Sequence, residues 1–151
     1  MLSVTTTLAR TAISRLRTAE DSLTRHTILA TFDHWRSNFP SKKNCRFQRT
    51  LAILRQSDGP SSVEELSQAV GVSERQLQRL FRDRVGMTPK FYLRFLRFER
   101  TYQFLVANPR HPYAEIAFRY GYADEAHLIR EFRFFCGLTP RGLAATIPAL
   151  S

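Results

Sequence analysis

The sequence predicts an all-α fold in which two three-helix units are joined by one long helix and preceded by a helical N-terminal extension. The first observation behind this prediction is an internal repeat. Residues 77–89 read LQRLFRDRVGMTP, and residues 128–140, fifty-one positions later, read LIREFRFFCGLTP. The second observation is that apolar residues recur at helical spacing, with no convincing two-residue alternation of the kind that strands show. Repetition and spacing together predict a duplicated helical module.

The composition favours a folded protein with a polyanionic partner. Of the 151 residues, 43% are hydrophobic, which is enough for a core, and 23 Lys and Arg outweigh 13 Asp and Glu to give a formal net charge of +10. A basic balance of this size favours nucleic acid, although a solvated surface with excess charge is the alternative. No apolar run approaches the roughly 20 residues of a membrane span, so no membrane partner is expected.

The two cysteines indicate neither metal binding nor redox chemistry. Cys45 and Cys136 lie in no C-x-x-C or other metal-binding spacing. Cys136 matches Val85 in the repeat, so its expected role is that of a small buried hydrophobic residue. We therefore expect a reducing, cytoplasmic setting, with no metal and no cofactor.

The N-terminal part of the chain predicts a helical extension. Residues 7–36 carry an apolar stripe at helical spacing and predict one or two helices. Residues 38–44 contain a proline and two lysines and are typical of a linker. We therefore expect residues 1–43 to form an extension and linker, and residues 44–151 to form the main domain.

The main domain begins with a short predicted helix over residues 46–57, which the turn formers at 58–60 end. The next helix opens with Ser62 and Glu65, an S-x-x-E capping box. It runs to about Val70, where Gly71 supplies a tight turn because glycine accepts positive φ freely.

A third helix follows the turn at once. Ser73 is its predicted cap, and Gln76 completes a second capping box. This helix runs to about Val85 and ends at Gly86. A pair of short helices around a glycine turn is typical of a helix-turn-helix, which we place at about residues 62–86.

A long linker helix is predicted over about 89–107, because Thr88 is a suitable cap and Pro89 suits the first helical position. Its aromatic residues have helical spacing and are expected in the core rather than as nucleobase stackers. These aromatic residues are Phe91, Phe95, Phe98, Tyr102 and Phe104.

The second half repeats this plan at about residues 112–137. Gly121 makes the turn, Asp124 caps the following helix, and Gly137 ends it. The pair Thr139-Pro140 opens a last short helix, as Thr88-Pro89 opens the linker helix, and this last helix ends at 147–148. Aligned on their glycines, residues 66–71 match residues 116–121, but the second copy has one more residue in its turn.

The second helix of each motif has an apolar inner face and an outer face rich in Arg, Gln and His. Leu77, Leu80 and Phe81 form the expected buried face of the first copy, and Leu128 and Phe132 that of the second. A recognition helix lies in the major groove of DNA, where Arg can bind guanine and Gln can bind adenine through two hydrogen bonds. The outer faces therefore predict two DNA-reading helices.

The candidates for base reading are Arg75, Gln76, Gln78 and Arg79 in the first unit, and Glu125, Ala126, His127 and Arg130 in the second. The candidates for phosphate contact are Ser73, Arg82, Thr88, Lys90, Arg133, Thr139 and Arg141. The second outer face has fewer polar readers, although Ala126 and Ile129 are suited to contact thymine methyl groups. We expect the first unit to contribute more sequence information.

Several candidates have an alternative structural role. Arg79 and Arg130 are suited to pack along aromatic residues or to pair with acidic neighbours. His127 is equally suited to be a half-buried polar neighbour of the core. His127 and Cys136 lie nine residues apart on one predicted helix, so they share no face, and no catalytic motif stands out; an enzyme is not predicted.

Residues 47–145 resemble the DNA-binding domain of AraC/XylS-type transcriptional regulators. The segments that carry the resemblance read LSQAVGVSERQLQRLFRDRVGMTPKFYLRFLRFERTYQFL and EIAFRYGYADEAHLIREFRFFCGLTPRGL. The resemblance implies two helix-turn-helix units reading successive major-groove faces of one DNA site. It implies base contacts at positions that include Arg75, Gln78, Arg79, Ala126, His127 and Arg130. It also implies promoter control, often through RNA polymerase. The residues before the match are too few for the usual sensor barrel, so we expect a member that lacks it.

The leading prediction is therefore a sequence-specific regulator of transcription that binds double-stranded DNA and associates with the nucleoid. Two non-identical readers in one chain predict an asymmetric site on the order of 20 base pairs. The alternative is a truncated regulator that self-associates through residues 7–36 and inactivates a full-length relative by pairing with it. Non-specific DNA packaging is a broader alternative, which would show equal affinity for unrelated duplexes.

Overall fold

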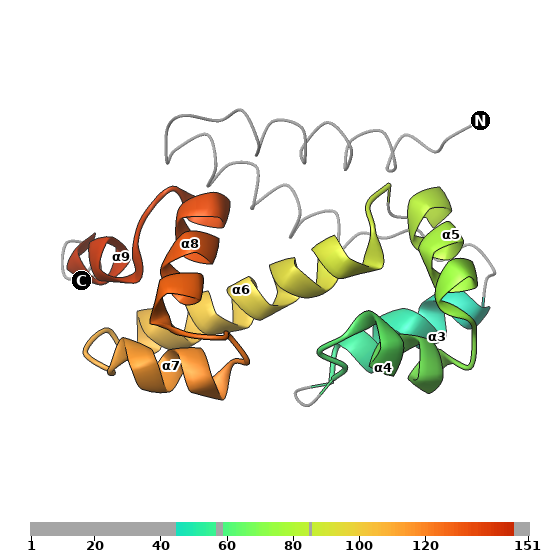
Figure 1. Ribbon diagram of the computed structural model, residues 1–151, viewed down its shortest axis with the longest axis horizontal. Helices are drawn as coiled ribbons and strands as arrows, with labels where there is room; N and C mark the ends of the chain where they lie inside the picture. Colours follow the sequence, from blue (N-terminus) through green and yellow to red (C-terminus); the bar gives the residue numbers. More distant parts are fainter. Residues whose placement is uncertain (1–44, 57–58, 85, 147–151) are drawn as a thin grey trace. The chain divides into compact units, whose positions relative to one another are not determined.

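The computed structural model describes residues 45–56, 59–84 and 86–146. Within these ranges the chain forms seven α-helices and no strand (Figure 1), which confirms the all-α prediction. The described chain divides into two compact units, and the division falls between Arg94 and Phe95, inside one helix. The extension predicted over residues 1–43 lies outside the described residues, so the domain boundary at 43–44 stays a prediction.

Unit 1 contains α3 (Cys45–Leu54), α4 (Val63–Val70), α5 (Glu74–Arg84) and the beginning of α6 (Pro89–Ala107). The ring of Phe81 on α5 lies at its centre and is fully buried. Phe47 of α3 and Tyr92 of α6 meet that ring edge-on, with centroids 6.3 Å and 5.6 Å away. Each edge-on pair adds roughly 0.5–1.5 kcal/mol to the gain from burial. The outer side of α5 remains exposed.

Unit 2 contains the rest of α6 together with α7 (Tyr113–Arg119), α8 (Glu125–Cys136) and α9 (Pro140–Thr146). Phe98 of α6 occupies the position that Phe47 has in unit 1. Its ring lies 5.1 Å from that of Phe132 and stacks on Phe135 at 4.9 Å. Since Phe132 and Phe135 are fully buried, one side of α8 is fixed against α6.

The predicted caps are present at the helix N-termini. Ser62 accepts a hydrogen bond from the Glu65 amide at 3.1 Å, and Asp124 accepts one from the His127 amide at 2.6 Å. The Glu65 carboxylate reaches Ser61 rather than the capping residue, with hydrogen bonds from its amide and hydroxyl. These two hydrogen bonds lower the pKa of Glu65 because they stabilise its ionised form. Each cap is worth about 1 kcal/mol to its helix.

The predicted turns also form at glycines. Gly71 has φ of +75° and Gly121 has φ of +70°, which is the left-handed conformation that favours glycine. The residue after each glycine donates its amide to the small residue five positions earlier, Val72 to Ser67 and Tyr122 to Ala117. The same hydrogen bond thus closes both glycine turns, so the sequence repeat is also a structural repeat in this region.

Three details of the core differ from the sequence-based expectation. Leu80 is half-buried, whereas Leu77 and Phe81 are fully buried, because α5 turns only a narrow stripe inward. Of the five linker-helix aromatics, Phe95 and Phe98 belong to the buried core. The other three, Phe91, Tyr102 and Phe104, are half-buried. The helix predicted over 46–57 ends at Leu54, and the predicted end at 147–148 lies outside the described residues.

Candidate nucleic-acid interface

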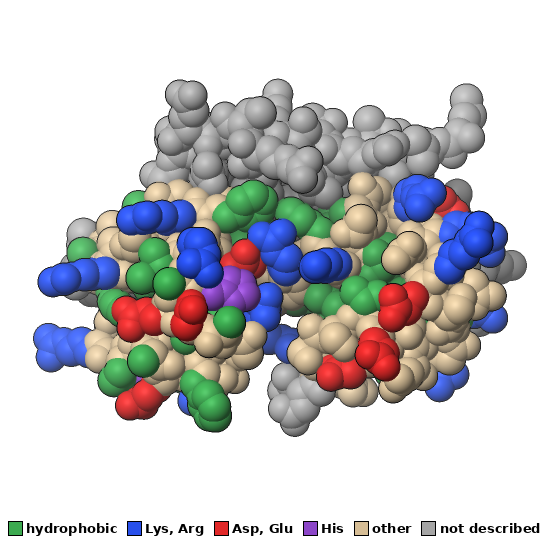
Figure 2. Space-filling view, in the orientation of Figure 1, with side chains coloured by type: hydrophobic (Ala, Val, Ile, Leu, Met, Phe, Trp, Pro, Cys, Tyr) green, Lys and Arg blue, Asp and Glu red, His purple; other side chains and the backbone are tan. Residues whose placement is uncertain are grey.

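The outer face of α5 is exposed as predicted. Leu77 and Phe81 point into unit 1, while Arg75, Gln78 and Arg79 are exposed on the other sides of the helix. Arg82, one turn further on, is exposed as well. Figure 2 shows basic side chains gathered over α5 and over α8 and α9. Helix α5 therefore exposes hydrogen-bond donors to solvent on one side, while its other side packs in the core of unit 1.

Ser73 and Gln76 are engaged with each other. The Ser73 hydroxyl accepts from the Gln76 amide at 3.3 Å, and the Gln76 side-chain oxygen accepts from the Ser73 amide at 3.0 Å. Recognition of adenine by glutamine uses both ends of the side-chain amide. Because the oxygen of Gln76 is already used in the cap, Gln76 is less suited than Gln78 to bind adenine in this way, and both base contacts stay predictions.

The outer face of α8 is partly different from the expectation. Glu125, Ala126 and Arg130 are exposed, but His127 and Ile129 are half-buried. His127 accepts a hydrogen bond at Nδ1 from the Ala123 amide, at 3.2 Å. Accepting at Nδ1 leaves the ring proton on Nε2, which remains a possible donor. His127 is therefore half-buried, and its role as a base reader stays a prediction.

The extra turn residue explains the position of His127. Ala123 is the added residue, and its amide donates to the ring of His127 in the first turn of α8. His127 occupies the position that Gln76 has in the first unit, three residues after the cap. Both side chains accept from an amide just before the helix, Gln76 from Ser73 and His127 from Ala123. The ring of His127 also meets Tyr122 edge-on, with centroids 5.3 Å apart.

The phosphate candidates include two threonines that act as caps. Thr88 accepts from the Phe91 amide at 3.2 Å and Thr139 from the Gly142 amide at 3.0 Å. A hydroxyl that accepts keeps its own proton for a phosphate oxygen. The cationic candidates Arg82, Lys90, Arg133 and Arg141 are all exposed.

Ion pairing does not occupy the central arginines of the two outer faces. Within residues 45–56, 59–84 and 86–146, neither Arg79 nor Arg130 forms an ion pair with an acidic neighbour. Both side chains are exposed. The structural alternative for these two residues is therefore weaker than their role as donors.

Sequence reasoning missed a further part of the repeat. Residues 46–50 read RFQRT and residues 97–101 read RFERT, again fifty-one positions apart. Thr50 and Thr101 are both fully buried and donate to the carbonyl four residues earlier, at 2.9 Å and 2.7 Å. The signal lay in the sequence, but one copy opens a helix and the other lies in the middle of α6.

Arg97 begins the second copy of this segment, and its side chain contacts the turn of unit 2. Its guanidinium donates to the carbonyl of Gly121 at 2.8 Å and lies over the ring of Tyr122, 4.9 Å from the centroid. The Tyr122 hydroxyl lies 3.2 Å from that of Thr101. Burial raises the pKa of Tyr122 to about 12, against the opposing effect of the Arg97 charge.

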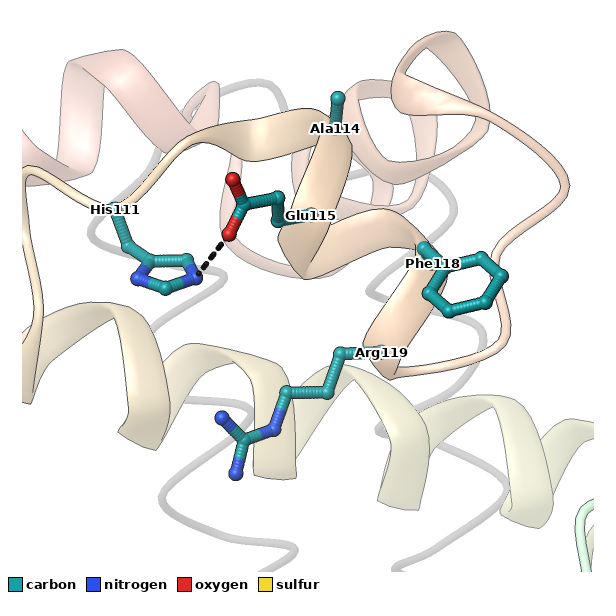
Figure 3. A pocket seen from close by; sticks show the side chains of 5 residues that line it. All are labelled: His111, Ala114, Glu115, Phe118 and Arg119. Atoms are coloured by element: carbon teal, nitrogen blue, oxygen red, sulfur yellow. Dashed lines mark ion pairs between the residues drawn. The ribbon is translucent and has the colours of Figure 1, made fainter.

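A hollow of about 530 Å³ lies beside α7, lined by His111, Ala114, Glu115, Phe118 and Arg119 (Figure 3). His111 Nε2 lies 3.3 Å from the Glu115 carboxylate. Phe118 is 88% exposed, and its ring points away from that pair (Figure 3). The hollow is open to solvent, and no residue of α5 or α8 lines it.

The remaining chemistry of the described residues is limited. Cys136 is buried and its thiol donates to the Phe132 carbonyl at 3.2 Å, which confirms a packing role. Residues 45–56, 59–84 and 86–146 hold no group of three His, Cys, Asp or Glu that is placed to bind a metal. No helix in that part of the chain is both long and apolar enough to cross a membrane.

Comparison with known proteins identifies the family. The family model described as "Helix-turn-helix domain" matches residues 66–145, and the chain belongs to this family. A solved structure titled as a transcriptional regulator with an AraC-type DNA-binding domain, from Chromobacterium violaceum, is 27% identical. It superimposes with a TM-score of 0.59 over 68% of this chain and 91% of that chain. The resemblance to AraC-type regulators is thereby confirmed.

Two curated relatives carry regulator names. The "HTH-type transcriptional regulator ArgR" of Pseudomonas aeruginosa is 31% identical over 94 residues, which are 62% of this chain and 28% of the relative. An "Uncharacterized HTH-type transcriptional regulator" of Haemophilus influenzae is 29% identical over 90 residues, 60% of this chain and 30% of the relative. The chain thus spans less than a third of the length of either relative.

Proposed function

We propose that the protein is a transcription regulator that binds double-stranded DNA in a sequence-specific way. The observation that carries the proposal is the duplicated helix-turn-helix, in which α5 and α8 each fix one side in a core and expose Arg on the other. The family match and the AraC-type structural neighbour support the same class of protein. A net charge of +10 suits a polyanionic partner.

In the proposed complex each recognition helix enters the major groove. Arg75 and Arg79 would donate to guanine, and Gln78 would pair with adenine through both ends of its free amide. The second helix would read guanine through Arg130 and touch thymine methyl groups through Ala126. The first unit therefore contributes more hydrogen-bonded sequence information than the second.

The surrounding polar side chains supply the contacts that set the register on the duplex. Arg82, Lys90, Arg133 and Arg141 are exposed cations next to the two readers. Ser73, Thr88 and Thr139 lie at helix N-termini, where amides and hydroxyls favour a phosphate oxygen. Each phosphate contact releases a counterion, so affinity falls steeply as the salt concentration rises.

The finer parts of the proposal concern partners and location. A regulator of this class would act on promoters in the cytoplasm, at the nucleoid, and would reach RNA polymerase there. Self-association would use residues 7–36, which lie outside the described residues. The comparisons do not favour the alternative of a pairing module that inactivates a relative, since the matched residues are those of the helix-turn-helix domain.

Selection of preferred duplexes from a random pool tests the proposal. We expect one enriched asymmetric site on the order of 20 base pairs, the span of two successive major-groove segments. Arg79→Ala and Arg130→Ala should each lose roughly 5- to 150-fold in affinity for that site, the worth of one good bidentate contact. Arg110→Ala is the matched control, because it removes one exposed Arg outside the recognition helices.

Two results would contradict the proposal. Absence of any enriched sequence, with equal affinity for unrelated duplexes, would indicate non-specific packaging. Equal, small losses for Arg79→Ala, Arg130→Ala and Arg110→Ala would show that the two readers supply only charge. Both measurements use gel-shift titration at one stated salt concentration.

A further inference from the structure

The extended repeat singles out one residue of α6. Arg97 and Arg46 are equivalent, since each begins an Arg-Phe-x-Arg-Thr segment. Phe47 and Phe98 make the same contact to the recognition helix of their unit. The equivalence ends at the turn, where Tyr122 of unit 2 replaces Val72 of unit 1. The turn of unit 2 therefore offers this arginine an aromatic ring, whereas the turn of unit 1 has a valine at the equivalent position.

Arg97 contacts the turn of unit 2 in two ways. Its guanidinium binds the Gly121 carbonyl and lies over the Tyr122 ring. Its backbone carbonyl accepts from the Thr101 hydroxyl at 2.7 Å. A threonine hydroxyl has one proton, so at the 3.2 Å contact Thr101 accepts from Tyr122. Tyr122 is thus held at its ring face and at its hydroxyl.

Tyr122 in turn borders the start of the second recognition helix. The ring of His127, on the first turn of α8, packs edge-on against the ring of Tyr122. His127 also accepts from Ala123, the extra residue between Tyr122 and the cap. A continuous chain of contacts therefore runs from Arg97 through Tyr122 to His127, one residue beyond Ala126. The longer turn needs such support, because the additional residue increases its conformational freedom.

We propose that Arg97 is a positioning residue for DNA recognition, which fixes the longer turn of unit 2 so that α8 meets base edges in register. This inference rests on the proposed function. Arg97 acts through Gly121 and Tyr122 rather than by reading bases. Sequence discrimination in the DNA segment read by α8 depends on it, whereas discrimination in the segment read by α5 does not.

The competing role for Arg97 is a plain phosphate contact, and the two roles give different results. A positioning residue affects the penalty for a wrong base, because reading requires close geometry. A phosphate contact weakens binding uniformly across sequences and lowers the salt slope by about 1. The experiment therefore measures affinity for the selected site and for duplexes that are substituted in one segment at a time. The DNA segment that α8 reads is identified with Arg130→Ala: it is the segment in which a wrong base no longer weakens the binding of this variant.

In the wild-type protein we expect a wrong base in either segment to weaken binding by roughly 5- to 150-fold. In Arg97→Met the penalty in the α8 segment should fall to within about 2-fold, while the α5-segment penalty stays unchanged. Arg46→Met is the matched control at the equivalent position, and it should leave the α8-segment penalty intact. Uniform weakening with both penalties retained and a lower salt slope would overturn the positioning role.

Arg97→Lys keeps the test decisive if the methionine variant does not fold. Lysine retains the charge, but its ammonium has no planar face to lie over Tyr122 while donating to Gly121. We expect most of the α8-segment penalty to be lost with the salt slope unchanged. Full retention of the penalty in Arg97→Lys would overturn the inference. Wild-type protein without a penalty in either segment would instead refute the proposed function, so the two failures are distinguishable.

Discussion

Replacement of Thr101 by valine should destabilise the protein more than the same replacement of Thr50. Both threonines are fully buried, and both donate to a carbonyl in the preceding turn. In Thr50→Val that carbonyl keeps its helical amide, so we expect a loss of about 1 kcal/mol or less. In Thr101→Val the buried hydroxyl of Tyr122 also loses its acceptor, which costs about 1–3 kcal/mol. The expected difference is therefore about 1–3 kcal/mol.

Urea-induced unfolding followed by circular dichroism measures this difference, and a third variant isolates its cause. Tyr122→Phe removes the hydroxyl that Thr101→Val leaves unpaired. The double variant should therefore be more stable than Thr101→Val alone, since replacing both partners by apolar groups is nearly neutral. If Thr101→Val and Thr50→Val cost the same, or if Tyr122→Phe gives no recovery, the Tyr122 hydroxyl is not held by Thr101 and the reasoning fails.

Three further predictions follow from the same geometry. The pKa of Tyr122 is raised from 10.0 to about 12, so between these pH values the unfolded chain has lost a proton that the folded chain keeps. Stability should therefore fall as the pH rises through that window, by up to about 1.4 kcal/mol per pH unit. The check is a phenolate absorbance titration of the wild type and of Tyr122→Phe. If the tyrosine that is missing from the variant titrates with an ordinary pKa, the prediction is wrong. Gly71→Ala and Gly121→Ala should each cost roughly 1–2 kcal/mol in thermal unfolding, from left-handed strain alone, because an added Cβ meets nothing within 4 Å at either position. A much larger loss at one of them would reveal a clash. Asp124→Ala should lose about 1 kcal/mol with its cap, and Asp124→Asn should lose much less; equal losses would show that the cap bond is not the cause.

The helices and caps could be predicted because they depend on local chemistry. Ser73 and Gln76 form their reciprocal hydrogen bonds within four residues of sequence, so the pattern alone identifies them. Gly71 and Gly121 are predictable for the same reason, since a left-handed turn selects glycine. The all-α architecture and the exposure of Arg79 follow from apolar spacing alone.

The environment of His127 and the role of Arg97 could not be predicted in the same way. Helical spacing gives the side of α8 on which His127 lies, but it does not show that the Ala123 amide needs an acceptor. Arg97 contacts Gly121, twenty-four residues away, and such a contact depends on the folded turn. The repeat of RFQRT and RFERT was the available signal, and it pointed to an equivalence rather than to a contact.

The length changes between the two units cancel, and this has an evolutionary consequence. The spacing is fifty-one from Arg46 to Arg97, fifty from Ser67 to Ala117, and fifty-one again from Leu77 to Leu128. One residue is thus missing from an early loop of the later copy and one is gained at its glycine bend. The two length changes lie between Thr50 and Ser67 and in the glycine turn, while the contact of Phe47 and of Phe98 with its recognition helix is the same in both copies. Because each unit has its own core, the outer face of one recognition helix can change after duplication while the core stays the same. A change in the preferred DNA sequence therefore does not require a new fold.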